Sequence, residues 1–383
     1  MIDHRDHNHQ NQQYQWKSSS IMAQKPPQMA IIGAGIFVKS QYIPRLAEIS
    51  ELVALKAIWS RTEKSAREAT EIARKVFPNV ECKWGDDGID EIIRDPDVVA
   101  AAVVLSGQIQ VDMSLKLLKA GKHVLQEKPA AASCSEVEAA LSSYRFLSNT
   151  PSAQPIWAVA ENYRFEPAFV ESRKLVSEIG DMMSVQVIID GSMNSSNPYF
   201  SSSWRRNLTG GFVLDMGVHY VAGLRMLIGC DITSVSATTS HVNMDVPPPD
   251  IISSLFQLEN GCSGVFVLLV STKNPKIVWR VVGLNGTVQV ERGNKDGQPG
   301  YVVSLFTANK ETKSTFYPYT GVIEELKTFL SDVSRASLQK GSTFEAEPRC
   351  SYAEGARDIA VLDAMLESGT KQGASVKVKN FRQ

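Results

Sequence analysis

The sequence has few cysteines, and they form no motif. Five cysteines are scattered over 383 residues, and no two of them stand in a C-x-x-C pair. An odd number of dispersed cysteines argues against a disulfide framework, and the missing C-x-x-C pairs argue against a zinc site. We therefore expect free thiols in a reducing, cytoplasmic compartment and no bound metal.

An excess of charge of one sign is also missing. The 40 Lys and Arg residues nearly balance the 41 Asp and Glu residues, and there is no long run of Lys or Arg. We therefore expect no nucleic acid among the partners.

Hydrophobic runs are short as well, since residues 98–105 and 265–270 fall far below the ~20 residues of a membrane-spanning helix. Both runs are typical of buried strands in a soluble protein, so no membrane contact is expected.

The first 28 residues lack an apolar segment that could act as a secretion signal. They are rich in His, Gln, Asn and Ser, and we expect a disordered tail. His4, His7 and His9 could bind a metal ion, but a polar, low-complexity arm is the preferred interpretation of these histidines.

The first half of the chain does contain a clear alternation of strands and helices. Five strands are predicted, four of them at 29–33, 53–59, 98–105 and 156–160 and one leading to Lys128. The helices predicted between and after them cover residues 37–50, 63–76, 84–94, 110–120 and 134–147. This alternation predicts a Rossmann-type, doubly wound parallel sheet over residues 29–160, with right-handed crossovers.

The second half changes in texture, and its apolar residues often alternate. Strands are predicted at 185–189, 235–241, 251–258, 264–271, 276–282, 287–291, 302–306 and 376–379, and helices at 166–179, 215–228, 322–334 and 351–367. Successive strands joined by short turns indicate a mostly antiparallel sheet. We therefore expect residues 161–383 to form an α+β domain for substrate binding and oligomerisation.

The turn after the first strand suggests a dinucleotide site. Gly33 and Gly35 allow a tight turn and the close approach of a pyrophosphate, whose charge the following helix N-terminus favours. The third glycine of G-x-G-x-x-G is absent, because Val38 stands in its place. The turn is therefore a weak signal by itself, since two glycines after a strand also occur in proteins that bind no nucleotide.

The end of the second strand favours NADP over NAD. An NAD site usually ends this strand with an acidic residue that binds the ribose hydroxyls, whereas this chain has Ser60, Arg61 and Thr62. A guanidinium and two hydroxyls suit a ribose 2′-phosphate. The alternative is that Arg61 only begins a solvated helix.

A lysine in the tripeptide Glu127-Lys128-Pro129 closes the strand that begins at residue 123. Ligands of doubly wound sheets bind at the carboxyl ends of the strands, so Lys128 is placed toward the cofactor. Pro129 restricts the preceding residue and can hold the lysine in one direction. Taken alone, the tripeptide also fits a lysine on a solvated loop.

Histidine is scarce after residue 28, where only His123, His219 and His241 occur. His219 follows Asp215 by four residues, so both face one side of a predicted helix. A histidine can exchange a proton near neutral pH, and a nearby carboxylate can hold its tautomer. Hydride transfer to a carbonyl needs such a proton donor. The alternative is an Asp215 that caps the helix and a His219 that only packs.

The motifs together resemble the glucose-fructose oxidoreductase, inositol dehydrogenase and MocA family. The glycine turn at 33–35, the segment 120–125 before the tripeptide at 127–129, and the G-G-x-x-x-D-x-G-x-H segment at 210–219 follow in that family's order and approximate spacing. The resemblance covers about residues 29–381 and includes plant members of the family.

This resemblance implies roles for individual residues. Lys128 would contact the substrate oxygen and the nicotinamide ribose, with Pro129 in the cis form. His219 would act as general acid in reduction or base in oxidation, and Asp215 would orient it or bind a substrate hydroxyl. The candidate cofactor-binding residues are Gly33, Gly35, Ile36, Phe37, Ser60, Arg61, Thr62, Ser106, Glu127 and Lys128, and the candidate substrate-binding residues are Asn162, Arg164, Trp204, Arg205 and His219.

Two of these positions have an alternative, and one loop departs from the family pattern. Arg164 and Arg205 fit surface ion pairs equally well. Relatives carry a T-P-N segment with a later histidine where this chain has Ser106, Gly107, Gln108 and Gln110, so the loop beside the nicotinamide is expected to differ.

These features predict an NADP-dependent oxidoreductase acting on a hydroxyl or carbonyl carbon of a small polar metabolite, such as a sugar or cyclitol. One alternative is a lyase or glycosidase that oxidises its substrate transiently on a tightly bound cofactor. Another is a nucleotide-binding regulator without turnover. A homodimer or homotetramer through the C-terminal sheet is expected, because that sheet would leave an apolar face to cover.

Overall fold

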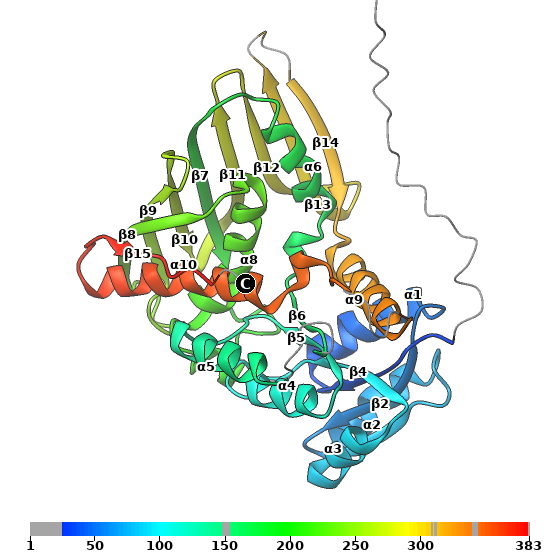
Figure 1. Cartoon of the computed structure of the whole chain (residues 1–383). Helices are drawn as coiled ribbons and strands as arrows, with labels where there is room; N and C mark the ends of the chain where they lie inside the picture. The colour runs from blue at the N-terminus through cyan, green and yellow to red at the C-terminus, as the bar shows by residue number, and fades with distance from the viewer. Residues whose placement is uncertain (1–24, 148–153, 308, 310–311, 339–343, 382–383) are drawn as a thin grey trace, which may run out of the picture.

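The structure is a computed structural model that describes residues 25–147, 154–307, 309, 312–338 and 344–381. The tail predicted for residues 1–28, with His4, His7 and His9, lies outside these residues except for its last four. The described chain forms two sheets that lie one above the other in Figure 1, joined by helices.

The first sheet is parallel throughout and has the strand order β3-β2-β1-β4-β5-β6. Its strands are β1 (Gln28–Ile32), β2 (Ala54–Ser60), β3 (Glu81–Trp84), β4 (Val98–Val103), β5 (His123–Glu127) and β6 (Trp157–Ala160). The central strands are almost wholly apolar because both faces of the sheet are covered. The strand order reverses between β1 and β4, and ligands of doubly wound sheets bind at such a reversal. The predicted fold class is confirmed.

Helices pack on both faces of this sheet. The π-helix η1 (Val38–Tyr42), α1 (Ile43–Glu48) and α2 (Glu63–Ala73) share one core with the sheet, and α3 (Gly85–Arg94), α4 (Gln110–Lys119) and α5 (Cys134–Arg145) share the other. The sequence predicts neither β3 nor the strand boundary before α3. The reason is that β3 is a four-residue edge strand whose side chains are partly or fully exposed, so it carries no hydrophobic pattern.

The second sheet has nine strands in the order β14-β13-β12-β11-β7-β10-β9-β8-β15, and only β7 and β10 pair in parallel. Its strands are β7 (Met182–Ser192), β8 (Ile232–Ser240), β9 (Ile251–Leu258), β10 (Ser263–Leu269), β11 (Ser271–Gly283), β12 (Gly286–Lys295), β13 (Gln298–Thr307), β14 (Thr312–Pro318) and β15 (Val376–Lys377). The mostly antiparallel sheet predicted for this half is therefore present. The exposed edge strand β14 had no alternating apolar pattern by which the sequence could predict it.

Helices cover one face of the second sheet. These are α6 (Pro167–Val176), α8 (Gly211–Ile228) and α10 (Tyr352–Thr370), and the short helices η3 (Asn162–Arg164) and α7 (Ser203–Arg206) lie near them in sequence. Helix α8 is the one described helix that is long and apolar enough to cross a membrane, and 78% of it is buried inside the protein. It is the central core helix of this half, and its first turns carry Asp215 and His219.

The chain crosses between the two halves more than once. Helix α9 (Gly321–Leu338) lies beside α1 (Figure 1), and its Leu326, Phe329, Leu330 and Val333 belong to the core of the first sheet. The 3₁₀ turn η4 (Pro348–Cys350) then leads to α10, which contacts α8 as well as α5 and β6. Both helices fasten the second half to the first, so the ends of β5 and β6 are held close to α8.

Candidate active site

Lys128 directly follows strand β5, and its side chain reaches the second half of the protein. Its Nζ donates to Asp215 Oδ1 at 3.0 Å and to the Asp215 backbone carbonyl at 2.9 Å. The Lys128-Pro129 peptide bond is cis, as predicted. The lysine side chain is 14% exposed and that of Asp215 is 6% exposed, so the lysine faces away from bulk solvent. The solvated-loop alternative for Lys128 is therefore wrong.

Asp215 lies in the second turn of α8 and holds two cations. The helix begins at Gly211 after Gly210, whose φ of +78° lies in the left-handed region that glycine favours, so Asp215 is not a helix cap. Its Oδ2 accepts from Arg205 Nε at 2.9 Å, while Oδ1 accepts from Lys128. Burial raises the pKa of Asp215, but Lys128 and Arg205 outweigh burial and hold the pKa below its ordinary value.

His219 lies one helical turn after Asp215, but another carboxylate holds it. Its Nδ1 lies 2.7 Å from Glu161 Oε1, and Asp215 is instead bonded to Lys128 and Arg205. The expectation that Asp215 orients the imidazole is therefore corrected in favour of Glu161. Glu161 follows strand β6 directly, a strand-end position that could have marked it in the sequence, as it marked Lys128.

Burial and Glu161 act on the protonation of His219 in opposite directions. Burial lowers its pKa, Glu161 raises it, and the net pKa lies below the ordinary value. Burial raises the pKa of Glu161, but the imidazole and neighbouring cations bring it below its ordinary value. At neutral pH the pair is therefore an uncharged imidazole beside a carboxylate. Nδ1–H then donates to Glu161, and Nε2 is left as a proton acceptor.

An aromatic side chain fixes the plane of the imidazole. The Tyr163 ring stacks on His219 with 4.9 Å between the ring centroids and an interplanar angle of 20°. Tyr163 is buried and also packs against Phe169, Tyr220 and Trp279. With Glu161 on its edge and Tyr163 on its face, the imidazole has little freedom to rotate.

The glycine turn lies at the carboxyl end of β1, where a cofactor would bind. A Cβ at Gly33 would lie 2.2 Å from the Val104 carbonyl oxygen, and the φ of +135° also requires glycine there. Nothing lies within 4 Å of a Cβ added at Gly35, and Gly35 and Ile36 are exposed. Helical residues run from Ile36 through Phe37 to the end of α1. An open backbone turn that leads into a helix fits a pyrophosphate.

The predicted NADP-selecting residues follow β2. Arg61 is exposed, and within the described part of the chain its guanidinium has no ion-pair or hydrogen-bond partner. Thr62 is the N-cap of α2, because its hydroxyl accepts from the Ser65 backbone N–H at 3.4 Å. Ser60 is the last residue of β2 and is half-buried. Thr62 is thus engaged in the helix cap, whereas the exposed guanidinium of Arg61 is available to bind a ligand.

Glu127 is the last residue of β5 and lies inside the protein. Its carboxylate accepts from the Tyr42 hydroxyl at 2.8 Å, which ties the end of β5 to the helix after the glycine turn. Burial raises the pKa of Glu127 to about 7, even though Lys128 and the Tyr42 hydrogen bond lower it. Glu127 therefore holds the end of β5 against η1, the helix that follows the glycine turn.

The loop after β4 differs from the expected family pattern, and it bridges to other parts of the site. Gln108 Nε2 donates to the Trp204 carbonyl at 2.8 Å, and Gln110 Nε2 donates to the Pro129 carbonyl. Ser106 lies in this loop and is half-buried. The two glutamines therefore hold the loop against α7 and against the peptide that follows Lys128.

The candidate substrate residues do not all lie in the same surroundings. Arg205 belongs to the site, because it bonds to Asp215 and its guanidinium lies over the rings of Trp204 and Tyr199, with distances of 4.2 and 4.5 Å to the ring centroids. Asn162 is half-buried, and its amide lies 3.3 Å from Glu166 Oε1.

Arg164 does not fit either expectation for it. It is buried, donates to Asp358 and to the Glu354 carbonyl, and lines a pocket beside Arg225 and Arg357 of α8 and α10. It is neither a surface ion-pair residue nor a neighbour of Lys128 in any hydrogen bond. A guanidinium in this position stabilises the packing of η3 on α10, so Arg164 is withdrawn from the substrate-binding residues.

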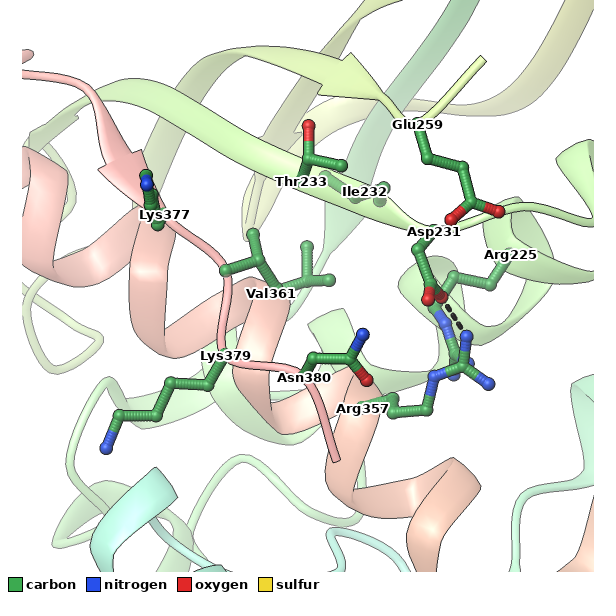
Figure 2. A pocket seen from close by; sticks show the side chains of 11 residues that line it. Arg225, Asp231, Ile232, Thr233, Glu259, Arg357, Val361, Lys377, Lys379 and Asn380 are labelled. Carbon is green, nitrogen blue, oxygen red and sulfur yellow. Dashed lines mark hydrogen bonds and ion pairs between the residues drawn. The ribbon is translucent and has the colours of Figure 1, made fainter. Parts of the chain in front are cut away.

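A second pocket lies next to the one beside Arg164, near the C-terminal end of α8 (Figure 2). Arg225, Asp231, Arg357 and residues 377–380 line part of it, and an ion pair joins Arg357 to Asp231. None of the residues around Lys128 contributes to it. Asp215 and His219 occupy the early turns of α8 and Arg225 its last turn, so this pocket is separate from the candidate active site.

Comparisons with known proteins identify the family. Residues 28–150 match the oxidoreductase family model with the NAD-binding Rossmann fold, and residues 169–289 match the Gfo/Idh/MocA C-terminal domain. The chain belongs to the Gfo/Idh/MocA family of oxidoreductases. The first model describes an NAD-binding Rossmann fold, and the residues that it matches contain strands β1 to β5 of the parallel sheet.

Individual relatives are dehydrogenases. The chain is 28% identical to "Dehydrogenase FPY6" of Fusarium mangiferae over 375 residues, covering 92% of this chain and 99% of the relative. It is 26% identical to scyllo-inositol 2-dehydrogenase (NADP(+)) of Bacillus subtilis, covering 52% of this chain and 51% of the relative. The structure of levoglucosan dehydrogenase with NADH and levoglucosan superimposes with a TM-score of 0.74 at 21% identity, covering 92% of this chain and 99% of the other. The last similarity shows the fold.

Proposed function

We propose that this protein is an NADP-dependent oxidoreductase that transfers a hydride between the nicotinamide and a hydroxyl or carbonyl carbon of a small polar metabolite such as a sugar or cyclitol. The observation that carries this proposal is the contact of Lys128 with Asp215. It brings a strand end of the dinucleotide-binding half within hydrogen-bond distance of the helix that carries His219. A proton-transfer group and an ammonium group thus lie together at the sheet edge where a cofactor binds.

The residues have distinct roles in this proposal. A bound nicotinamide supplies or accepts the hydride. His219 accepts the hydroxyl proton at Nε2 during oxidation and returns it during reduction, while Glu161 keeps the proton of the other ring nitrogen in place. Lys128 donates a hydrogen bond to the reacting oxygen and stabilises negative charge that develops on it. Asp215 and Arg205 keep the lysine directed toward the substrate.

The lowered pKa of His219 affects which direction of the reaction, oxidation or reduction, is faster. The imidazole is neutral at pH 7, which is the form that a base needs to accept a proton from an alcohol. Reduction needs the protonated form, so it should require a lower pH or a proton delivered through Lys128. We therefore expect oxidation of the hydroxyl to be faster than reduction above neutral pH.

The choice of NADP rests on Arg61. Its exposed guanidinium follows the strand whose carboxyl end binds the ribose in dinucleotide-binding folds, and no acidic residue takes its place. A guanidinium can bind a 2′-phosphate through two hydrogen bonds, whereas it gains little from a 2′-hydroxyl. The relatives do not decide between the two cofactors, because one has NADP(+) in its name and the structure of another contains NADH. The preference for NADP is therefore inferred from the residues of this chain.

We also propose a homodimer or homotetramer formed through the nine-stranded sheet. Helices cover one face of this sheet, and the residues of β9 alternate between buried and exposed. On the opposite face, Leu255 is 61% exposed, and Val265 and Val267 of β10 are half-buried. A second copy packed on this face would bury these apolar side chains.

The proposal is tested by an activity screen with matched variants. Aldoses, polyols and cyclitols are offered with NADP⁺, and the corresponding carbonyl compounds with NADPH, while nicotinamide absorbance is followed. We expect turnover by the wild type and by Lys116→Ala, which removes an exposed lysine of α4, and little or none by Lys128→Ala and His219→Ala. Equal rates for all four proteins would contradict the proposal. Mass spectrometry of the purified protein completes the test, because a bound nucleotide that never exchanges would indicate transient oxidation by a lyase or glycosidase.

A further inference from the structure

Arg292 lies on the helix-covered face of the second sheet. It belongs to β12 and pairs with Tyr301 of β13. Side chains two residues apart on a strand point to the same face, so Arg292 shares a face with the buried Val288 and Val290. Unlike these two, the Arg292 side chain reaches solvent, although its guanidinium makes a partly buried hydrogen bond to Tyr163. The strand therefore directs a cation toward the helix side of the sheet at a place that solvent can reach.

One tyrosine connects this cation to the candidate catalytic histidine. Arg292 Nη2 donates to the Tyr163 hydroxyl, and the Tyr163 ring stacks on the His219 imidazole at 4.9 Å. The Arg292 guanidinium also lies 5.8 Å from the centroid of the Tyr319 ring. Arg292 and His219 thus contact the same tyrosine, the first at its hydroxyl and the second at the face of its ring.

Arg292 has no carboxylate partner within the described residues. Arg205 and Arg225 each form an ion pair with an acidic side chain, whereas the nearest hydrogen-bonding group of Arg292 is a neutral phenol. Burial lowers its pKa, but the hydroxyls of Tyr163, Tyr301, Tyr220 and Tyr319 all raise it, so the guanidinium stays charged. Tyr220 packs edge-on against Tyr163, and both Asp215 and Arg292 affect the pKa of its hydroxyl.

We infer that Arg292 binds an anionic group of the substrate, so that the enzyme prefers an acidic sugar or polyol over a neutral one. This inference rests on the proposed function, since it names the substrate class of the same site. A guanidinium carries five N–H donors in a planar fork, and the bond to Tyr163 uses one of them. The remaining donors match a carboxylate or a phosphate, and the tyrosine hydroxyls nearby can bind the anion or neighbouring hydroxyls.

The inference is tested by calorimetry on the full-length protein saturated with NADPH. The probes are D-glucuronate, D-glucose 6-phosphate and neutral D-glucose. Arg292→Gln removes the charge but keeps an N–H donor for Tyr163, Arg292→Lys keeps the charge, and Lys295→Gln removes an exposed lysine of the same strand. Thermal unfolding of each variant shows whether it is folded.

We expect one or both acids to bind the wild type at least about tenfold more tightly than glucose, and Arg292→Gln to weaken that binding about 10- to 100-fold, as the loss of a charged hydrogen bond implies. Arg292→Lys should recover part of the loss, and Lys295→Gln should behave as the wild type. The acid that binds more tightly identifies the group as carboxylate or phosphate. Glucose bound as tightly as the acids, no binding of either acid, or an unchanged Arg292→Gln would overturn the inference.

A further variant separates this inference from the proposed function. Lys128→Ala should lose turnover and still bind the acids, because it leaves Arg292 in place. Acid binding that depends on Arg292 in a protein without any nicotinamide turnover would contradict the proposed function and support the anion site. Nicotinamide turnover together with acid binding that Arg292→Gln leaves unchanged would support the function and overturn the anion site.

Discussion

Lys128 and Asp215 contact each other through two hydrogen bonds, one to the carboxylate at 3.0 Å and one to the backbone carbonyl at 2.9 Å. The two residues come from different halves of the protein, and both are largely buried. Neither charge can be removed without consequence for the other, because a buried charge that loses its partner is unstable. Arg205 remains as a second cation on Asp215 when Lys128 is replaced, so the carboxylate stays paired.

Replacing Lys128 with Met should therefore affect activity more than folding. We expect kcat to fall about 10²- to 10⁴-fold, since the ammonium group at the reacting oxygen is lost, while the melting temperature changes little. Steady-state kinetics and thermal unfolding are measured side by side. A variant that unfolds but retains its specific activity would contradict the assigned role.

Replacing Arg61 with Ala should change the preference between cofactors. We expect kcat/KM for NADPH to fall about 10- to 100-fold and that for NADH to change less than about twofold, because the guanidinium binds only the 2′-phosphate. Arg67→Ala removes an exposed arginine of the neighbouring helix that pairs with Glu63, and it serves as the control. Equal losses with both cofactors would show that Arg61 does not read the phosphate.

The pH profile of alcohol oxidation should report on His219. The neutral imidazole is the active base and its pKa is lowered, so the rate should stay constant down to below pH 6.5 and then fall with further acidification. Glu161 raises this pKa, so in Glu161→Gln the fall should move to still lower pH. The plateau rate should drop about tenfold or more, because the tautomer is no longer held. A profile that moves to higher pH in Glu161→Gln would be inconsistent with this pairing.

Glu127 should make folding stability depend on pH. Its pKa rises from 4.5 to about 7 on folding, so between these values the unfolded state loses its proton first and stability falls as pH increases. Gln at this position still accepts the Tyr42 hydrogen bond. We expect Glu127→Gln to match the wild type near pH 4.5 and to be more stable by about 2–3 kcal/mol at pH 8 in urea unfolding. Glu171→Gln, on the exposed surface of α6, should show no such difference.

The oligomer should depend on the uncovered face of the second sheet. Light scattering should give the mass of a dimer or tetramer for the wild type, and Leu255→Lys should shift it toward the monomer by placing a charge in the interface. Leu284→Lys changes an equally exposed leucine in the turn between β11 and β12, and it should leave the mass unchanged. A wild-type monomer at micromolar concentration would refute the proposed assembly.

The predictable part of the fold is the part with strong periodicity. Buried parallel strands such as β1 and β4 are continuous apolar runs, and α8 is a long apolar helix, so the sequence alone indicates them. The edge strands β3 and β14 have partly or fully exposed side chains without a regular apolar pattern, and only pairing with a neighbour makes them strands. The packing of α9 against the first sheet also escapes the sequence, because an amphipathic helix does not show which core receives its apolar face.

The candidate site shows the same division. Lys128 and His219 were predicted because a strand end and a helical spacing place them, and the structure brings their segments together. Glu161 is marked in the sequence only by its position after a strand, and Arg292 by no motif. The fold alone places the first at the imidazole of His219 and the second at the hydroxyl of the tyrosine stacked on it. Arg164 shows the converse, since its neighbours in sequence suggested a substrate contact and its neighbours in space are Asp358 and Glu354.

The sequence by itself determined the family, the parallel sheet with its glycine turn, and the residue types available for hydride and proton transfer. These follow from local spacing and short-range backbone preference. The tertiary structure alone decided which carboxylate holds His219, which cations share Asp215, and that Arg292 contacts a tyrosine hydroxyl. These choices depend on contacts between residues far apart in the chain, whose distances are set by the packing of β5, β6 and α8 and not by their order.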